Sequence, residues 1–182
     1  CYKKCMIRKT QRDYIMSQRV DGFKGGIQSG TMAFDDASFR LDKQLKESRD
    51  SMNVDLKMVK QFSYEDKMKF VGDDCFGFAP DGGAWFKDDK LVAVFEAKKQ
   101  GLGGNAYERW WDNASTAKYI NEDVVYVTFC SGPGAAEGKC LDRLKRKANI
   151  MMGDNFKFFM SPNGFTDEEV YTIMENILGE IV

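Results

Sequence analysis

Histidine is absent from this chain of 182 residues, and its absence excludes several kinds of catalytic site. Without an imidazole there is no Ser-His-Asp or Cys-His nucleophile, no histidine base of the HNH nuclease type and no histidine-ligated zinc. Any hydrolytic chemistry must therefore come from carboxylates, lysine, tyrosine, cysteine or a bound metal ion.

Cross-linking cysteines and long apolar segments are lacking too. The five cysteines include no Cys-x-x-Cys pair, and their odd number favours neither a disulfide framework nor a zinc site. The longest apolar run, 91–95, is far shorter than the roughly 20 residues that a membrane-spanning helix needs. The first residues are polar and basic with no apolar core, unlike a signal peptide. We therefore expect a soluble, cytoplasmic protein without a membrane partner.

The chain also lacks a surplus of either charge, with 27 Lys and Arg against 28 Asp and Glu. A nonspecific nucleic-acid coat would be strongly basic, so that class is excluded. A DNA enzyme that combines an acidic metal site with a local basic groove remains open. The length and the apolar content of 43% predict a single domain over 1–182, with 1–30 as a flexible N-terminal arm that ends in a glycine-rich stretch.

Hydrophobic periodicity predicts an α/β fold, in which a central mixed β-sheet is flanked by α-helices on both faces. A short strand is expected around 54–58, and a helical turn over 63–71. Thr166 and Glu169 form a capping box for the last helix. The other expected helices are 34–49, 105–120, 141–150 and the segment up to about 178; the other expected strands are a hairpin over 84–98, then 123–130 and 156–160.

The hairpin is the most informative segment, because its turn fixes which residues face each other. Asp88 and Asp89 form a plausible two-residue turn, so Lys87 would pair with Lys90. Counting back from that pair brings the segment before the hairpin beside the end of its second strand. The residue that arrives there is Asp81.

Asp81 would lie opposite Glu96, or one position away if the loop is one residue longer. Glu96 and Lys98 are two residues apart, so their side chains project from the same face of the strand. Two carboxylates and an ammonium then converge, as binding of a divalent metal ion and activation of a water molecule beside a phosphate require. The alternative is an edge hairpin with ordinary surface charges. We favour the site because Glu96 and Lys98 end an otherwise apolar strand.

Two motifs in this region resemble a known family. Pro80-Asp81 followed by Glu96-Ala97-Lys98 resembles the bipartite motif of the PD-(D/E)XK nuclease superfamily. Beyond a glycine-containing loop, the chain continues with a segment similar to the Gly-Asn-Ala-x-Glu-Arg signature of the EcoRI and MunI restriction endonucleases. That segment reads Gly104-Asn105-Ala106-Tyr107-Glu108-Arg109. The resemblance spans 78–120.

The resemblance implies a restriction-endonuclease-like fold and a type II restriction endonuclease that hydrolyses double-stranded DNA with Mg²⁺. Asp81, Glu96 and the Ala97 carbonyl would hold the metal ion, and Lys98 would position or deprotonate the attacking water. A palindromic site calls for a homodimer. The resemblance also implies a cognate DNA methyltransferase as functional partner and a recognition site that contains AATT.

The second motif is suited to reading bases. Asn105 stands at a helix start, where backbone N–H groups favour a phosphate, and its amide matches the N6 and N7 atoms of adenine. Ala106 is small enough for close approach to base edges. Arg109 can donate toward a purine N7, and Glu108 can accept from an exocyclic amine or hold an arginine of the second subunit. A plain Asn cap with a surface Glu-Arg pair is the alternative.

Two rival functions remain open from the sequence. A different PD-(D/E)XK nuclease, acting in repair, junction resolution or phage recombination, would share the catalytic residues but select DNA structure. A non-catalytic DNA-binding protein would leave DNA intact and need no metal. A further basic segment, formed by Lys139, Arg143, Lys145, Arg146 and Lys147, is either a phosphate contact or a solvated helix face.

Overall fold

A computed structural model describes residues 32–63, 65, 78–99, 106–132 and 139–182 of the chain. For 32–39, 106–110, 139–141 and 144 it describes the backbone alone. The predicted N-terminal arm, 1–30, lies outside the described residues, as does most of the helical turn expected over 63–71.

The described strands form one five-stranded mixed sheet in the order β1-β2-β3-β4-β5. The first three are antiparallel neighbours: β1 (Lys57–Val59), β2 (Ala84–Lys87) and β3 (Lys90–Lys99). The last two, β4 (Val125–Ser131) and β5 (Phe156–Ser161), continue the sheet in parallel with β3. The carboxyl ends of β3, β4 and β5 therefore meet at one edge of the sheet.

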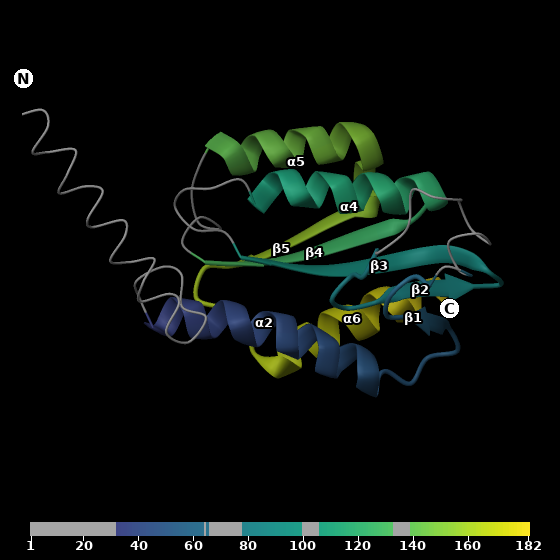
Figure 1. Cartoon of the computed structure of the whole chain (residues 1–182), viewed down its shortest axis with the longest axis horizontal. Helices are drawn as coiled ribbons and strands as arrows, with labels where there is room; N and C mark the ends of the chain where they lie inside the picture. Colours follow the sequence, from purple (N-terminus) through teal and green to yellow (C-terminus); the bar gives the residue numbers. More distant parts are fainter. Residues whose placement is uncertain (1–31, 64, 66–77, 100–105, 133–138) are drawn as a thin grey trace, which may run out of the picture.

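Four α-helices cover the sheet within the described part of the chain, two on each face (Figure 1). Helices α4 (Ala106–Ile120) and α5 (Lys139–Met152) lie on one face. Helices α2 (Met32–Ser51) and α6 (Asp167–Ile181) lie on the other. The prediction of an α/β fold with a mixed sheet between helices is confirmed.

Each face of the sheet has its own apolar core, because side chains alternate along the buried strands. On the α4/α5 face, Tyr126 of β4 packs with Val94 of β3 and Ala117 of α4. On the α2/α6 face, Phe129 of β4 packs with Leu45 of α2. Both cores are dominated by side chains with almost no exposed surface, so the sheet is a rigid base for residues at its edge.

Most predicted elements are present, with ends that lie within three residues of those predicted. The capping box of α6 is confirmed: Glu169 N–H donates to Thr166 Oγ1 over 3.1 Å, and Thr166 N–H donates to Glu169 Oε2 over 2.7 Å. The prediction of a strand around 54–58 is corrected by the structure, because β1 begins only at Lys57. Its partner β2 is short, so pairing is limited to Lys57–Val59, and the preceding apolar residues pack into the core without joining the sheet.

The hairpin turn has the predicted pairing, with Lys87 opposite Lys90. Asp88 and Asp89 have φ angles of 50° and 62°, as a type I′ turn requires. Further along, Phe86 pairs with Leu91 but Trp85 pairs with Ala93, so Val92 is an extra residue in β3. This β-bulge turns the side chains of two successive residues, Val92 and Ala93, toward the α2/α6 core.

Candidate active site

Asp81 and Glu96 meet where β3 approaches its carboxyl end. The backbone N–H of Asp81 donates to Glu96 Oε2 over 3.2 Å, and the backbone N–H of Ala97 donates to Asp81 Oδ2 over 3.2 Å. The bulge moves the register by one position, so Asp81 lies beside Ala97 while remaining bonded to Glu96. The predicted convergence of Asp81, Glu96 and Lys98 is present as geometry, since Lys98 also contacts Glu96.

Two glycines let the Asp81 segment lie against β3. A Cβ atom on Gly82 would lie 2.5 Å from Phe95 Cβ, a distance that no side chain tolerates. The close approach permits a 2.9 Å hydrogen bond from Gly82 N–H to Phe95 O. Gly83 has a φ of +82°, which L-residues rarely adopt. The Asp-Gly-Gly sequence thus holds the Asp81 backbone at a fixed distance from β3.

Glu96 is buried, with 4% of its surface exposed, and its carboxylate is fully engaged. Oε1 accepts from the ammonium of Lys98 on the same strand face, as predicted from their spacing. It also accepts from Asn113 Nδ2 of α4 over 3.0 Å. A buried carboxylate is stable only when it is paired and hydrogen-bonded, and Glu96 satisfies both conditions.

Helix α2 supplies three polar groups around Asp81 that the sequence did not predict. Arg49 Nη1 donates to the Asp81 backbone oxygen over 2.6 Å, and Lys46 Nζ lies 4.0 Å from Asp81 Oδ1. The carboxyl group of Asp42 is close enough to that of Asp81 for each to shift the pKa of the other. In the sequence, the one sign that Asp42 could lie near the sheet is its position directly after Leu41, a buried residue of α2. For Asn113 the corresponding sign is its position one helical turn before the buried Ala117, which places both side chains on the same face of α4.

The pKa values of the Asp81 and Asp42 carboxyl groups shift in opposite directions. Burial raises the pKa of Asp81 to about 8, aided by the hydrogen bond to Asp42 and the negative charge of Glu96, although Lys98 opposes the shift. Burial acts to raise the pKa of Asp42 as well, but hydrogen bonds with Asp81 and Lys46 outweigh it and keep that pKa below its ordinary value. Of the two carboxyl groups, Asp81 is therefore the one that keeps a proton to higher pH.

The oxygen atoms at this edge of the sheet are of the kind that Mg²⁺ prefers as ligands. Phe95 directs both its N–H and its C=O toward the Gly82-Gly83 segment, so Ala97, two residues on, presents its carbonyl to the same side as Asp81. Two carboxylates and one carbonyl are hard oxygen ligands, and Mg²⁺ retains waters in its other positions. Within the described residues, no three acidic, histidine or cysteine side chains form a cation site by themselves. Water and a substrate phosphate would have to complete the coordination.

The predicted DNA-reading residues are only partly described. Helix α4 begins at Ala106, so Asn105 directly precedes it, as predicted. Asn105 itself lies outside the described residues. The side chains of Ala106, Glu108 and Arg109 do as well, although their backbone forms the first turn of α4. Their base-reading role stays a prediction.

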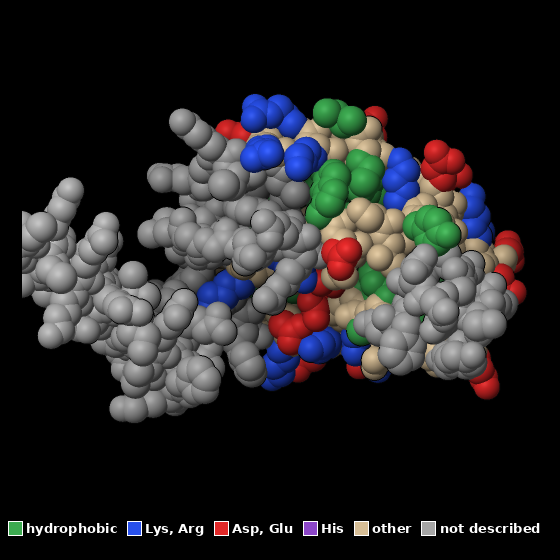
Figure 2. Space-filling view, turned by 45° about the horizontal axis from the view of Figure 1, so that its top comes forward, with side chains coloured by type: hydrophobic (Ala, Val, Ile, Leu, Met, Phe, Trp, Pro, Cys, Tyr) green, Lys and Arg blue, Asp and Glu red, His purple; other side chains and the backbone are tan. Residues whose placement is uncertain are grey.

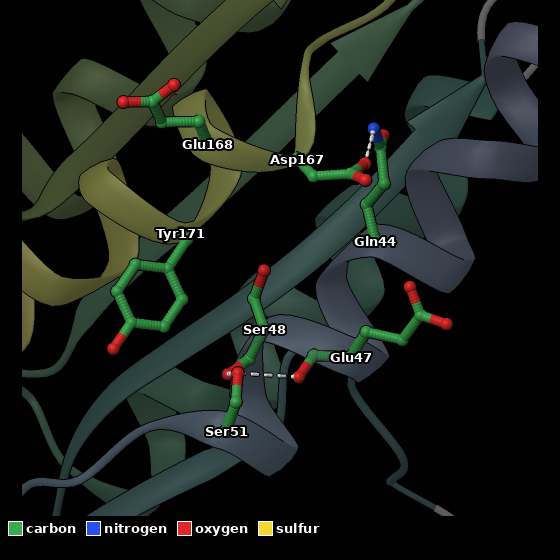
Figure 3. Close-up of a pocket in the computed structure, with 7 residues that line it drawn as sticks. All are labelled: Gln44, Glu47, Ser48, Ser51, Asp167, Glu168 and Tyr171. Carbon is green, nitrogen blue, oxygen red and sulfur yellow. Dashed lines mark hydrogen bonds between the residues drawn. The ribbon is translucent and has the colours of Figure 1, made fainter.

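A separate concave region of about 310 Å³ lies between α2 and α6 (Figure 3). Gln44 of α2 joins the two helices, because its Nε2 donates to Asp167 Oδ1 over 2.5 Å and to the Phe165 oxygen over 2.9 Å. The concave region shares no lining residue with the Asp81 site. Its lining is polar and acidic: Gln44, Glu47, Ser48, Ser51, Asp167, Glu168 and Tyr171.

Comparison of the chain with family models, curated proteins and solved structures gives no match. Among the helices of the described residues, none is long and apolar enough to cross a membrane. The case for a function depends on the geometry around Asp81, Glu96 and Lys98 and on the two sequence motifs.

Proposed function

We propose that this chain is a Mg²⁺-dependent endonuclease of the PD-(D/E)XK type that hydrolyses phosphodiesters in double-stranded DNA. The observation that carries the proposal is the convergence of Asp81, Glu96 and Lys98 at one strand end. A buried Glu-Lys pair is weak evidence for stability, so stability alone does not account for the ion pair of Glu96 and Lys98 beside Asp81. A site that binds a metal ion beside a phosphate explains why two carboxylates and an ammonium are held together there.

The residues have distinct roles in the proposed reaction. A bound Mg²⁺ would polarise the scissile phosphate and lower the pKa of a water molecule. Asp81 and Glu96 would hold the ion, with the Ala97 carbonyl as third ligand. Lys98 would orient the water whose oxygen forms the new bond to phosphorus as the bond to the leaving sugar oxygen breaks. Its ammonium would also offset charge on the phosphate oxygens in the transition state.

Asn113 and Arg49 would act as positioning residues. The Asn113 amide fixes Glu96 Oε1, and the Arg49 guanidinium holds the backbone oxygen of Asp81. Neither needs to touch the substrate. Both reduce the freedom of a ligand carboxylate, which matters because catalysis depends on placement within fractions of an ångström.

The restriction-endonuclease part of the proposal is supported by the second motif, Gly104 to Arg109. We extend it to a restriction-endonuclease-like fold, a homodimer, a palindromic site containing AATT and a cognate DNA methyltransferase. These features are supported by the motif's order and spacing relative to Glu96-Ala97-Lys98. The start of α4 at Ala106 is compatible with Asn105 presenting its amide at a helix end.

The proposal is tested by incubating the protein with plasmid DNA and Mg²⁺ and sequencing the fragment ends. Ends at one repeated palindrome are expected, and EDTA or the Lys98→Ala substitution should prevent cutting. Cuts located at branch points or at the ends of the DNA, without a common sequence, would indicate a structure-selective nuclease of the same superfamily. Intact DNA that is nevertheless bound without metal would refute catalysis and favour the non-catalytic DNA-binding protein.

A further inference from the structure

Lys46 is the most exposed of the three cations that the structure describes beside Asp81. Its side chain is 46% exposed, against 11% for Arg49 and 18% for Lys98. Arg49 is held by the backbone oxygen of Asp81, and Lys98 is held by the carboxylate of Glu96. Lys46 therefore presents its ammonium group at the rim of the candidate active site, where a substrate can reach it. The roles proposed above for the endonuclease do not use Lys46.

Two carboxylates hold Lys46 unequally. Its Nζ atom donates over 2.7 Å to Oδ2 of Asp42, which lies one helical turn earlier on α2. The distance from Nζ to Asp81 Oδ1 is 4.0 Å, which is longer than a hydrogen bond. An ammonium group has three N–H donors, so Lys46 can keep its contact with Asp42 and still donate to a further oxygen. Asp42 thus fixes the position of the side chain and leaves it able to bind a ligand.

Lys46 and Lys98 reach the carboxylates from opposite faces of the sheet. Lys98 projects from β3 on the same face as Glu96, whose carboxylate accepts a hydrogen bond from Asn113 of α4. Lys46 belongs to α2, which lies on the other face of the sheet (Figure 1). A phosphate bound beside Asp81 and Glu96 would therefore have one ammonium group on each side.

Acidic and basic side chains are mixed on the side of the molecule where α2 lies (Figure 2). Two exposed lysines form ion pairs with residues of this helix: Lys43 with Glu47 over 3.4 Å, and Lys60 with Asp50 over 2.7 Å. A polyanion on this side would therefore meet individual, paired cations and not a broad basic surface. Lys46 differs from these lysines because it also faces a carboxylate of the candidate active site.

The side chains described around the site balance each other in charge before a metal ion is added. With Asp81 ionised, as a metal ligand must be, three carboxylates face three cations: Asp42, Asp81 and Glu96 against Lys46, Arg49 and Lys98. A Mg²⁺ ion would add two positive charges, and Coulomb repulsion would then act between the ion and the ammonium of Lys46. A phosphate between the two cations relieves this repulsion. Metal binding and phosphate binding should therefore favour each other through Lys46.

We propose that Lys46 binds a phosphate of the DNA backbone and couples phosphate binding to metal binding at the candidate active site. In the structure its ammonium faces Asp81, beside the position that a metal ion would take. Once Asp81 holds Mg²⁺, Lys46 keeps its contact with Asp42 and donates to a phosphate on the α2 side of the scissile one. The inference rests on the proposed endonuclease function and adds a substrate-binding residue to the same site.

The test is the affinity of the whole chain for a fluorescently labelled duplex that contains AATT, measured at several salt concentrations in Ca²⁺ and in EDTA. Ca²⁺ also takes oxygen ligands, so it replaces Mg²⁺ in the binding assay. In Ca²⁺, Lys46→Gln should weaken binding about fivefold and reduce the salt dependence by about one phosphate contact. A duplex of random sequence should show the same loss, because a phosphate carries no sequence information. Lys46→Arg should bind like the wild-type chain, since it keeps the charge.

A second readout separates this coupling from a merely structural ion pair. Ca²⁺ should raise the affinity for DNA by a smaller factor in Lys46→Gln than in the wild-type chain. Without DNA, Mg²⁺ should stabilise Lys46→Gln against thermal unfolding at a lower concentration than the wild-type chain, because the repelling ammonium is gone. Lys43→Gln is the matched control and should change neither result: Lys43 is a lysine of α2 that is 67% exposed and pairs with Glu47.

The proposal is overturned if Lys46→Gln keeps both the salt dependence and the effect of Ca²⁺ that the wild-type chain shows. A loss of stability alone would mean that Lys46 only pairs with Asp42. Either result leaves the endonuclease standing as long as the wild-type chain cuts plasmid DNA in Mg²⁺. If Lys46→Gln shows the expected losses but no plasmid is cut, Lys46 binds phosphate in a protein without the proposed catalysis. A wild-type chain that neither binds the duplex nor cuts it refutes the endonuclease and this inference together.

Discussion

The backbone N–H of Asp81 donates to Glu96 Oε2 over 3.2 Å, so one carboxylate fixes the position of the other's main chain. Glu96 is thus both an expected metal ligand and the anchor of the loop that carries the second ligand. A substitution at Glu96 would disturb both positions, and loss of activity there would be difficult to interpret. The predictions below therefore use residues whose effects can be separated.

Lys98→Ala should reduce DNA cleavage by at least a hundredfold, because the side chain that orients the water and offsets phosphate charge is lost. Specific binding to DNA, measured in Ca²⁺, should change little. Lys90→Ala is the control: Lys90 lies at the other end of β3 and pairs with Asp123 over 3.2 Å at the surface. Cleavage by Lys98→Ala close to the wild-type rate would refute the role of Lys98.

Asn113→Leu should slow cleavage by about tenfold with little effect on the substrate KM, because the amide positions Glu96 Oε1 without touching DNA. The Mg²⁺ concentration needed for half-maximal rate should rise at the same time. A merely structural role would lower stability and leave that metal dependence unchanged. Thr116→Leu, at a partly buried position on the same helix, serves as the control for effects of the helix alone.

The unfolding free energy should fall as pH rises from about 4 to about 8. The pKa of Asp81 is about 8 in the folded chain against an ordinary value of 3.8, so in this window the folded chain holds a proton that the unfolded chain has lost. The contribution is at most about 1.4 kcal/mol per pH unit. Urea unfolding at pH 5 and pH 8 measures it.

Asp81→Asn should remove this pH dependence, because the amide does not titrate and its oxygen can still accept from Ala97 N–H. Mg²⁺ should stabilise the wild-type chain at pH 8 more than the variant, since the ion replaces the proton between carboxylates. An equal effect of Mg²⁺ on both proteins would argue against Asp81 as a ligand.

Asn105→Ala should weaken binding to a site with a central AATT by a factor that corresponds to about 1–3 kcal/mol. Binding to random DNA should be nearly unaffected, unlike the result of removing a phosphate-contacting lysine. Fragment ends at sites without AATT would refute the base-reading role of Asn105, Glu108 and Arg109. The proposed nuclease chemistry would survive that result.

Tyr126→Phe should raise the unfolding free energy by about 1 kcal/mol. The Tyr126 hydroxyl is buried and has no hydrogen-bond partner among the described residues, and burial of an unpaired hydroxyl is costly. The ring and its stacking on Phe156 are retained in the variant. Tyr119→Phe, at a residue that is 66% exposed, should have no such effect in the same denaturation assay.

Local rules predicted the helices and the hairpin well, because their signals lie within a few residues. Asp88 and Asp89 set the turn, and Thr166 with Glu169 set the start of α6. The bulge was not predictable in this way. The run from Leu91 to Phe95 is apolar at every position, so it contains no alternation from which a register shift can be read.

The groups around the site were harder to predict, because they come from distant parts of the chain. Asp42 and Arg49 reach Asp81 only through the packing of α2 on the sheet, and Asn113 reaches Glu96 only through the packing of α4. Such contacts follow from tertiary structure and have no fixed sequence spacing. Glu96 and Lys98 were predictable because a strand alone determines their relative direction.

The extra residue Val92 has a consequence for how the site tolerates change in chain length. Beyond the bulge, every side chain of β3 is displaced by one position relative to β2. Deletion of Val92 would therefore remove the bulge, and it would leave Trp85 opposite Ala93 and Asp81 beside Ala97. Leu91 and Ala93 would then follow each other on opposite faces, as in a regular strand. Among related chains, one residue fewer between the turn and Glu96 should thus accompany loss of the bulge and leave the contact between Asp81 and Ala97 in place.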